Sequence, residues 1–367
     1  MSEFIICSSC RRPYPEQGVP FQCPTCGGIY QITALPEVHL STEQDQTAGM
    51  WRYRDTFGLD TVAPLVSLGE GQTPLVWSEA FGRQVAFKLE FLNPTGSYKD
   101  RGSAVLTCFL KSRGVNEAVE DSSGNAGASF AAYAARSGIR ARIFIPSSAS
   151  GPKRNQIEAY GAELINVPGP RSEAANAVRQ AALQGAVYAS HAYLPQGIPG
   201  YATIAYEMFE QLGGVPGTVI SPAGQGNLLL GIGLGFKSLQ TAGLLDRLPT
   251  LIGVQARACA PLWAAANYGA DGLAWVSEGD TLAEGVRVRH PVRGDAVLNI
   301  IAETNGLFLA VDEEEILPGR DQLALQGFYV EPTSAIVWSA LQQLAPQIPG
   351  PVVVILTGSG LKSTNFS

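Results

Sequence analysis

The chain has 367 residues, of which 46% are hydrophobic and 16% are charged, and its formal net charge at pH 7 is −7. A chain of this length can bury two hydrophobic cores, and none of its apolar runs reaches the length needed to cross a bilayer. The negative net charge argues against a nucleic-acid-binding protein, because such proteins carry basic surfaces. We therefore expect a large cytoplasmic protein whose partners include neither a membrane nor nucleic acid.

Four cysteines near the N-terminus form two Cys-x-x-Cys pairs, Cys7 with Cys10 and Cys23 with Cys26, separated by twelve residues. This spacing is typical of a tetrahedral four-thiolate zinc site. Because thiolates fill all four positions, the spacing predicts a structural zinc ribbon over residues 1–32, with the metal supplying most of its folding free energy. Disulfides are the alternative, and the lack of a preceding signal peptide argues against them.

One lysine stands between turn residues and a new helix. The run Asn-Pro-Thr-Gly-Ser-Tyr-Lys at 93–99 begins as a turn, because proline fixes φ and glycine permits unusual backbone angles. The apolar run 104–110 predicts a buried helix that begins near Ser97 or Tyr98. Lys99 then lies in the first helical turn, where the helix dipole disfavours its charged form. Such an amine can condense with an aldehyde, so Lys99 is a candidate Schiff-base lysine. An exposed lysine on a surface helix is the alternative.

Two glycine-containing loops each follow a predicted strand and precede a predicted helix. The first, Ser-Ser-Gly-Asn-Ala-Gly at 122–127, leads into the alanine-rich helix 128–136. The second, Ser-Pro-Ala-Gly-Gln-Gly-Asn at 221–227, follows the buried-strand pattern 218–220. Each loop presents backbone N–H groups at a helix N-terminus to an anionic or polar ligand. A single glycine turn is weak evidence, but several in one chain, together with Lys99, indicate a binding site.

These motifs resemble those of the fold-type II pyridoxal-phosphate enzymes, and within that group they are most similar to those of threonine synthases. The resemblance covers essentially everything after about residue 64. It extends to three later motifs, which are Ala-Glu-Gly-Val at 283–286, Glu-Pro-Thr-Ser-Ala at 331–335 and Leu-Thr-Gly-Ser-Gly-Leu-Lys at 356–362. The resemblance implies pyridoxal 5'-phosphate as the cofactor and a small amino acid as the substrate.

The resemblance also implies roles for single residues. Lys99 would hold the cofactor as a Schiff base and then shuttle protons. Asn125 would bond the cofactor's phenolic oxygen, and Thr357 would face its pyridine nitrogen. A hydroxyl keeps that nitrogen protonated less well than a carboxylate does, which favours elimination and replacement over transamination. Backbone N–H groups of Gly224, Gln225, Gly226, Asn227 and Leu228 would bind the cofactor phosphate, while Ser122, Ser123, Ala126, Ser190 and His191 would lie beside the substrate. Helix capping is the alternative role for the two serines of the first loop.

Two departures from the threonine synthase pattern concern the substrate. The position between the glycines of the C-terminal motif, usually a histidine, is Ser359. The border segment 190–203 lacks the arginine with which this family grips the phosphate of phosphohomoserine. A dianion binds weakly without a cation. Candidate replacements are His191, Lys153, Arg154, Arg287, Arg289 and His290, each of which could instead be a structural or surface residue.

Apolar strands alternate with alanine-rich helices, which predicts an α/β architecture whose parallel strands are buried on both faces. Examples of such strands are 141–145, 164–167, 251–254 and 352–356. We expect a two-domain fold-type II enzyme with an N-terminal ribbon. The expected parts are the ribbon 1–32, a connecting segment 33–63, a large cofactor-binding domain from 64–106 and 214–367, and a small mobile domain 107–213. The low charged fraction favours a surface covered by a second copy, hence a homodimer.

The motifs favour a threonine synthase, a lyase that converts O-phosphohomoserine and water to threonine and phosphate. The departures at Ser359 and in the border segment leave a second interpretation open. It is another β-elimination or β-replacement enzyme, such as a serine or threonine dehydratase or a cysteine- or cysteate-synthase-like enzyme. A catalytically silent interaction module is a third interpretation, which the intact Lys99 and cofactor loops disfavour.

Overall fold

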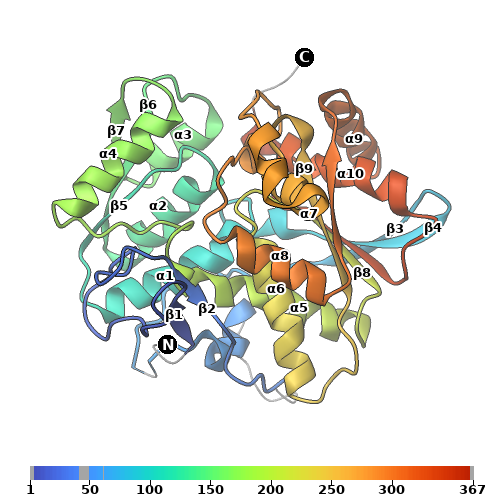
Figure 1. Cartoon of the computed structure of the whole chain (residues 1–367), viewed down its shortest axis with the longest axis horizontal. Coiled ribbons are helices and arrows are strands. Elements are labelled where there is room, and N and C mark those ends of the chain that lie inside the picture. The colour runs from blue at the N-terminus through green and yellow to red at the C-terminus, as the bar shows by residue number, and fades with distance from the viewer. Residues whose placement is uncertain (1–3, 41–48, 61, 364–367) are drawn as a thin grey trace. The chain divides into compact units, whose positions relative to one another are not determined.

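The computed structural model describes residues 4–40, 49–60 and 62–363 (Figure 1). No helix in these ranges is both long and apolar enough to span a membrane. The chain divides into two compact units. Unit 1 consists of Met1–Gly71, Asn93–Gly200 and Ser363–Ser367, and unit 2 consists of Gln72–Leu92 and Tyr201–Lys362.

The N-terminal part of unit 1 is a small two-stranded element that carries the four clustered cysteines. Strand β1 (Ile5–Cys7) pairs antiparallel with β2 (Tyr30–Ile32). The connecting segment predicted at 33–63 is described in part and contains a 3-10 helix at Gly49–Phe57. Its residues 41–48 and 61 lie outside the described ranges.

The rest of unit 1 is a three-stranded parallel sheet with helices. The strands lie in the order β5 (Glu117–Glu120), β6 (Arg140–Pro146) and β7 (Glu163–Val167), visible in green in Figure 1. Helix α4 contacts all three strands, α2 contacts α1, α3 and β6, and α3 contacts β7. These helices are α1 (Lys99–Ser112), α2 (Asn125–Ser137), α3 (Pro152–Ala159) and α4 (Arg171–Leu183).

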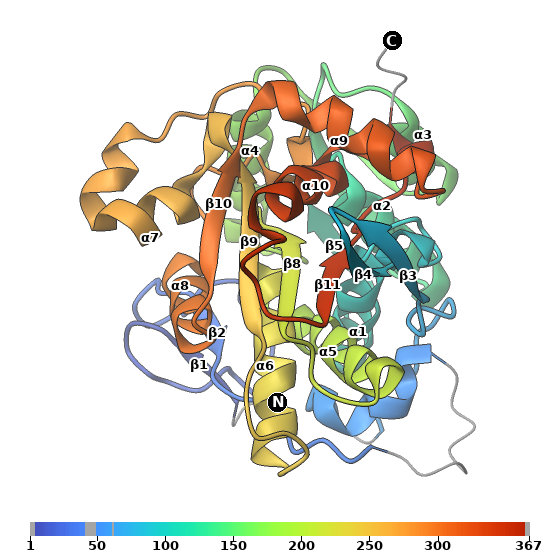
Figure 2. The ribbon, with the colours of Figure 1, turned by 90° about the vertical axis from the view of Figure 1, so that its right-hand side faces the viewer.

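Unit 2 is built on a six-stranded sheet in the order β10-β9-β8-β11-β4-β3, seen in Figure 2. All neighbours are parallel except β3, which pairs antiparallel with β4. The strands are β3 (Leu75–Ala80), β4 (Arg83–Lys88), β8 (Thr218–Pro222), β9 (Thr250–Ala256), β10 (Leu307–Val311) and β11 (Val352–Ile355). The helices are α5 (Ile198–Leu212), which begins at the end of unit 1, α6 (Asn227–Thr241), α7 (Pro261–Gly272), α8 (Gly294–Glu303), α9 (Glu313–Leu325) and α10 (Pro332–Leu344). Further 3-10 helices lie at Glu90–Leu92, Pro195–Gly197, Arg257–Cys259, Leu273–Trp275, Glu284–Val286 and Gly360–Lys362.

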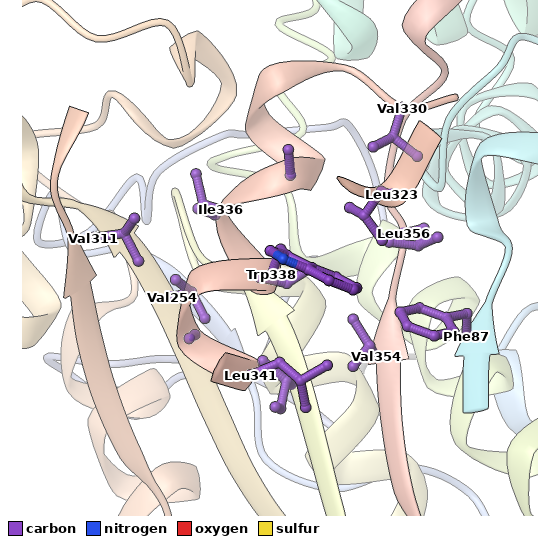
Figure 3. Close-up of a cluster of buried hydrophobic side chains, with 14 of the residues drawn as sticks. Phe87, Val254, Val311, Leu323, Val330, Ile336, Trp338, Leu341, Val354 and Leu356 are labelled. Atoms are coloured by element: carbon purple, nitrogen blue, oxygen red, sulfur yellow. The ribbon is translucent and has the colours of Figure 1, made fainter. Parts of the chain in front are cut away.

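The main core of unit 2 forms where α10 packs on the sheet. Figure 3 shows Trp338 and Leu341 of α10 directed toward the strands, with Phe87, Val254 and Val354 nearby. The strand residues are completely buried. A strand that is buried on both faces has a continuous run of apolar residues in its sequence, which explains the sequence Val-Val-Val-Ile in β11.

The predicted α/β fold with buried parallel strands is confirmed, and the four example strands appear as β6, β7, β9 and β11. The predicted helix after the 93–98 turn is α1, which begins at Lys99. The sequence analysis missed the β3–β4 hairpin, whose turn residues Phe81 and Gly82 have φ values of 51° and 72°. The predicted boundaries of the large and small domains stay a prediction, because they concern which parts of the chain move together.

Candidate functional site

Lys99 is the first residue of α1 in unit 1, and its side chain is partly buried. Its Nζ lies 4.8 Å from the centre of the Tyr98 ring. The preceding turn is fixed by the buried carboxylate of Asp100, which accepts hydrogen bonds from the Thr95 N–H at 2.7 Å and the Thr95 hydroxyl at 2.6 Å. The Ser129 hydroxyl of α2 donates to the same carboxylate at 2.7 Å. Asp100 therefore holds the turn, α1 and α2 in one arrangement around the lysine.

The loop 122–127 joins the carboxyl end of β5 to α2. The Ser122 hydroxyl accepts the N–H of Gly124 at 3.2 Å. A Cβ added at Gly127 would lie 1.8 Å from the carbonyl oxygen of Ser122, so only glycine allows this close approach. The first N–H groups of α2, which begins at Asn125, have no intrahelical acceptor. Ser122 and Ala126 are buried, and Ser123 and Asn125 are partly buried.

The second half of the site in unit 1 is a cluster of titratable side chains near His191. Imidazole Nδ1 of His191 lies 2.7 Å from Oε1 of Glu120. Burial raises the pKa of Glu120 to about 7, and the positive charge of Lys99 opposes this rise. Burial lowers the pKa of His191 well below its usual range, and Lys99 lowers it further. Lys99, Glu120 and His191 therefore share one electrostatic environment.

Asp121 completes this cluster. Its carboxylate accepts a hydrogen bond of 2.8 Å from the hydroxyl of Tyr188. Burial raises the pKa of Asp121, and the neighbouring Glu120 raises it further. The sequence analysis singled out His191 but missed both carboxylates, whose only signal was their position at the end of a predicted strand and directly before the serine loop.

Ser190 has a local structural task. Its completely buried hydroxyl accepts the N–H groups of Ala192 and Tyr193, each at 3.3 Å. These bonds form the turn that follows the residue. The Ser190 hydroxyl therefore stabilises the turn at the start of the border segment.

In unit 2, the loop 224–228 leads from β8 into α6. Gly226 has a φ of 78°, in the left-handed region that favours glycine, and a Cβ there would lie 2.6 Å from a methyl group of Val297. A Cβ at Gly224 would lie 2.6 Å from the carbonyl oxygen of Gly285. The Gln225 side chain accepts the N–H of Val292 at 2.9 Å. The loop is thus a fixed backbone turn that opens onto the N-terminus of α6, whose first N–H groups have no intrahelical acceptor.

Thr357 follows β11 and is 2% exposed. Its backbone N–H donates to the Ser334 hydroxyl at 2.8 Å, which ties it to the first turn of α10. Its own hydroxyl is buried and has no hydrogen-bond partner among the described residues. Since a buried hydroxyl without a partner is costly, this atom points to a ligand. Ser359, close by in the sequence, forms an isolated antiparallel bridge with Val330.

The candidate replacement cations occupy varied surroundings. Arg154 donates to the Ala149 carbonyl at 3.1 Å and to the Asn166 side chain at 3.2 Å. Arg287 forms an ion pair of 2.8 Å with Asp280. Lys153 is partly buried, whereas Arg289 and His290 are exposed. Arg154 and Arg287 therefore already have anionic or carbonyl partners.

Arg293 is a buried cation that the sequence analysis did not single out. It is 3% exposed and directly precedes α8, the helix whose Val297 packs on Gly226. Burial lowers its pKa to about 9. No motif marked this residue, because its neighbours in the sequence are also charged or turn-forming.

The predicted cofactor and substrate residues are divided between the units. Lys99, Asn125, the serines and His191 belong to unit 1, while the loop 224–228 and Thr357 belong to unit 2. Within unit 1 the structure brings Lys99 into the electrostatic environment of His191.

The four N-terminal cysteines form a separate cluster, in which all four Sγ atoms lie within 4.8 Å of one another. The Sγ atoms of Cys7 and Cys26 are 3.5 Å apart, and those of Cys10 and Cys23 are 3.7 Å apart. A Cβ at Gly28 would lie 2.9 Å from Sγ of Cys7. The two Cys-x-x-Cys turns thus converge on one point, as the spacing predicted.

Comparison with known proteins gives consistent results across most of the chain. Residues 66–358 match the family described as pyridoxal-phosphate-dependent enzymes. A threonine synthase of Methanocaldococcus jannaschii is 33% identical, with 97% of this chain and 92% of that protein aligned. A threonine synthase of Synechocystis is also 33% identical, with 90% of this chain and 88% of that protein aligned.

Solved structures show the same architecture. The T.th. threonine deaminase superposes with a TM-score of 0.68 at 25% identity, covering 80% of this chain and 94% of that one. Maize serine racemase has the same TM-score at 21% identity and covers 80% of this chain and 89% of that one. The fold is that of the fold-type II enzymes, and this chain belongs to the family of pyridoxal-phosphate-dependent enzymes.

Proposed function

We propose that the protein is a threonine synthase, which converts O-phosphohomoserine and water to threonine and phosphate. The observation that carries the proposal is the alignment, over 97% of this chain, with a relative that is named threonine synthase. The reaction is an elimination and replacement on a small amino acid, which suits a site with a hydroxyl at Thr357 in place of a carboxylate.

The residues present fit pyridoxal phosphate. The buried, unpartnered hydroxyl of Thr357 needs a polar partner, which a pyridine nitrogen supplies. The loop of Gly224, Gln225, Gly226, Asn227 and Leu228 offers backbone N–H groups at a helix N-terminus, which is the usual environment of a bound phosphate. Side chains at positions 224 and 226 would collide with neighbouring atoms, so both positions require glycine.

When bound at Lys99, pyridoxal phosphate withdraws electrons from the amino acid and weakens the bonds at its α-carbon. Lys99 Nζ moves protons at the α-carbon and at the neighbouring carbons of the substrate. The Asn125 side chain would donate a hydrogen bond to the phenolic oxygen of the cofactor. The loop 122–127 binds the substrate carboxylate through Ser122, Ser123 and the first N–H groups of α2. His191 lies beside the distal phosphate group of the substrate.

We also propose that the four clustered cysteines bind a structural zinc ion. A tetrahedral site with Zn–S bonds of about 2.3 Å places its sulfur atoms about 3.8 Å apart. The two observed separations, 3.5 and 3.7 Å, are close to this value. Four thiolates leave no position for a substrate, so the metal stabilises the ribbon and takes no part in the reaction.

A homodimer and a cytoplasmic location belong to the same proposal. The charged fraction of 16% supports an apolar surface covered by a second copy. None of the six cysteines, all of which lie in the described ranges, forms a disulfide, which suits a reducing compartment. Light scattering of the purified protein tests the dimer, since a monomeric mass contradicts it.

A second candidate function is β-elimination from an unphosphorylated amino acid, as in a serine or threonine dehydratase. The similarity to threonine deaminase at a TM-score of 0.68 favours it, and so do Ser359 and the missing arginine of the border segment.

One assay separates the two functions. The protein loaded with pyridoxal phosphate is incubated with O-phosphohomoserine, serine and threonine, and phosphate, threonine and keto acid are measured. Threonine with an equal amount of phosphate supports the proposal, whereas keto acid from serine or threonine supports the dehydratase. Lys99→Ala abolishes turnover and the visible absorption of the bound cofactor, while Lys111→Ala at the other end of α1 keeps both. A Lys99→Ala variant with normal turnover contradicts the assignment of this lysine.

A further inference from the structure

The carboxyl group of Glu120 contacts His191 and has no role in the function proposed above. Its Oε1 lies 2.7 Å from imidazole Nδ1, although the two residues are 71 apart in the sequence. The Glu120 side chain is 1% exposed and that of His191 is 19% exposed. A separation this short between an oxygen and a nitrogen is a hydrogen bond. One hydrogen atom therefore lies between the two side chains, which we call the Glu120–His191 pair.

The backbone fixes the pair at the edge of the substrate loop. Glu120 is the last residue of β5, and its second carboxyl oxygen accepts the backbone N–H of Ser122, the first residue of that loop. The pair therefore joins two segments that the proposed function places on either side of the substrate, namely the loop 122–127 and the border segment that begins at Ser190.

Four charged or titratable groups from other positions act on the pair. Lys99, on α1, and Arg171, at the start of α4, contribute positive charge. Asp121 is adjacent, and its carboxylate accepts the hydrogen bond from the hydroxyl of Tyr188. Burial raises the pKa of Tyr188 far above its usual value, so this hydroxyl keeps its proton. The cations and Asp121 have opposing effects on His191.

The charge state of the pair follows from its burial. Desolvation disfavours a charged carboxylate and a charged imidazole alike, and accordingly the pKa of Glu120 rises to about 7 while that of His191 falls. Below the Glu120 pKa of about 7, and before substrate binds, the pair thus holds one transferable proton, with the carboxyl and the imidazole both neutral.

A bound dianion changes this balance. An imidazolium beside a carboxylate is unfavourable in a buried site unless another charge compensates for its desolvation. A phosphate group next to His191 supplies that compensation, because it accepts a charge-assisted hydrogen bond and attracts the positive ring.

We propose that the proton of the pair moves from Glu120 to His191 when the phosphate group of the substrate binds. The O–H bond of the carboxyl breaks as an N–H bond forms at Nδ1. The N–H group at Nε2 keeps its hydrogen and donates a hydrogen bond to a phosphate oxygen. No proton is exchanged with solvent. Glu120 is then a positioning residue that acts through His191. The inference rests on the proposed function, because it requires a phosphorylated substrate.

Inorganic phosphate is the probe. Its binding to the protein loaded with pyridoxal phosphate is measured by calorimetry from about pH 6 to about pH 8.5, in two buffers of different ionisation enthalpy so that proton uptake is counted. The variants are Glu120→Gln, which keeps a hydrogen-bonding side chain but has no proton to give, and His191→Asn. The control is Glu117→Gln, a charge change on the same strand at a side chain that is 45% exposed.

We expect the dissociation constants of phosphate for the wild type and Glu120→Gln to differ by a factor that depends on pH. In Glu120→Gln, His191 must take its proton from solvent, so binding weakens at a lower pH than in the wild type and is accompanied by proton uptake. The ratio of the two dissociation constants rises with pH and levels off above the pKa of Glu120, about 7. The plateau is about 10- to 100-fold, the range expected for a charge-assisted hydrogen bond. His191→Asn binds weakly at every pH, and Glu117→Gln matches the wild type.

Three outcomes overturn the inference. They are a ratio that stays constant with pH, a ratio close to one, and equal proton uptake by the wild type and Glu120→Gln below the Glu120 pKa of about 7. If inorganic phosphate does not bind, the same ratio is taken from the KM for O-phosphohomoserine, and a flat ratio again overturns it. Circular dichroism confirms that each variant is folded.

The threonine assay on the same samples separates this inference from the proposed function. A wild-type protein that makes no threonine from O-phosphohomoserine refutes the function. A wild-type protein that makes threonine and shows a flat ratio refutes only the proton transfer.

Discussion

The ring of Phe21, in the cysteine-bearing N-terminal segment, packs edge-on against the ring of Tyr188, with 5.3 Å between their centres. A second T-shaped contact joins Phe21 to Tyr193 at 5.5 Å. The two tyrosines lie on either side of His191 in the sequence, and Tyr188 also holds Asp121. The N-terminal segment therefore supports the residues that surround the Glu120–His191 pair.

We expect Phe21→Ala to lower the free energy of unfolding by about 1–2 kcal/mol, because it removes two aromatic contacts at a half-buried position. The KM for the phosphorylated substrate should rise at the same time, since the border segment loses support. Urea denaturation and steady-state kinetics measure the two effects. Thr25→Ala is the control in the same segment, because it removes only an exposed hydrogen bond from Arg12. A stable variant with normal KM would show that the contact is unimportant.

Removal of the proposed zinc should lower the stability of the protein more than Phe21→Ala does. We expect about one zinc per chain, and a strong chelator should lower the melting temperature because the ribbon has little core of its own. The guanidinium of Arg113 donates to the carbonyls of Pro15 and Glu16 in this segment, and these contacts should loosen with the metal. Elemental analysis and calorimetry test this. Cys23→Ser should lose zinc while Cys108→Ala keeps it, and a metal-free wild-type protein of unchanged stability would contradict the proposal.

Gly127→Ala should destabilise the loop between β5 and α2. The new methyl group would stand 1.8 Å from the Ser122 carbonyl oxygen, so the loop backbone must shift. We expect a loss of about 2–4 kcal/mol, typical of a severe clash in a packed region. Gly124→Ala is the matched control for thermal unfolding, since its nearest neighbour would be the Ser122 hydroxyl at 3.8 Å. Equal melting temperatures for the two variants would refute the steric argument.

The ion pair between Lys88 and Glu207 is buried in unit 2, with a separation of 2.7 Å and side chains that are 0% and 1% exposed. Lys88 also donates to the Thr73 carbonyl and to the Gln211 side chain. Removing one partner leaves the other charge buried without compensation. Glu207→Ala should therefore lower the free energy of unfolding by about 3–5 kcal/mol. The double variant Lys88→Met/Glu207→Leu should recover most of this loss in urea denaturation.

The matched control for that pair is an ion pair at the surface. Lys237 and Glu303 are also 2.7 Å apart, but their side chains are 41% and 48% exposed. Glu303→Ala should therefore cost no more than about 1 kcal/mol. Similar losses for Glu207→Ala and Glu303→Ala would mean that burial does not determine the strength of the first pair.

The sequence predicted those parts of the fold that depend on local patterns. Strands such as β9 and β11 are buried on both faces, and their continuous apolar runs indicate this burial in the sequence itself. The β3–β4 hairpin was missed for the opposite reason. Strand β3 is largely exposed, and its turn has Phe81 at a positive φ where Asn or Gly is the usual signal.

The candidate site was predictable to the extent that its residues lie in recognisable motifs, as Lys99 and the loop 224–228 do. Glu120 was not predictable, because its importance comes from a contact with a residue 71 positions away. The same holds for Arg293, whose burial depends on the packing of α8 and on no local pattern. A motif indicates what a loop can bind, whereas a charge environment depends on tertiary contacts.

Strand β11 lies between β8 and β4 in the six-stranded sheet, although it is the last strand in the sequence among the described residues. The β3–β4 hairpin is made early during synthesis, yet among the described strands it pairs further with β11 alone. A nascent chain that ends before Val352 therefore has one hairpin and one group of parallel strands with no strand to join them. The unit 2 sheet can close only after Val352–Ile355 has left the ribosome, so truncations that remove β11 should yield aggregating protein rather than a smaller enzyme.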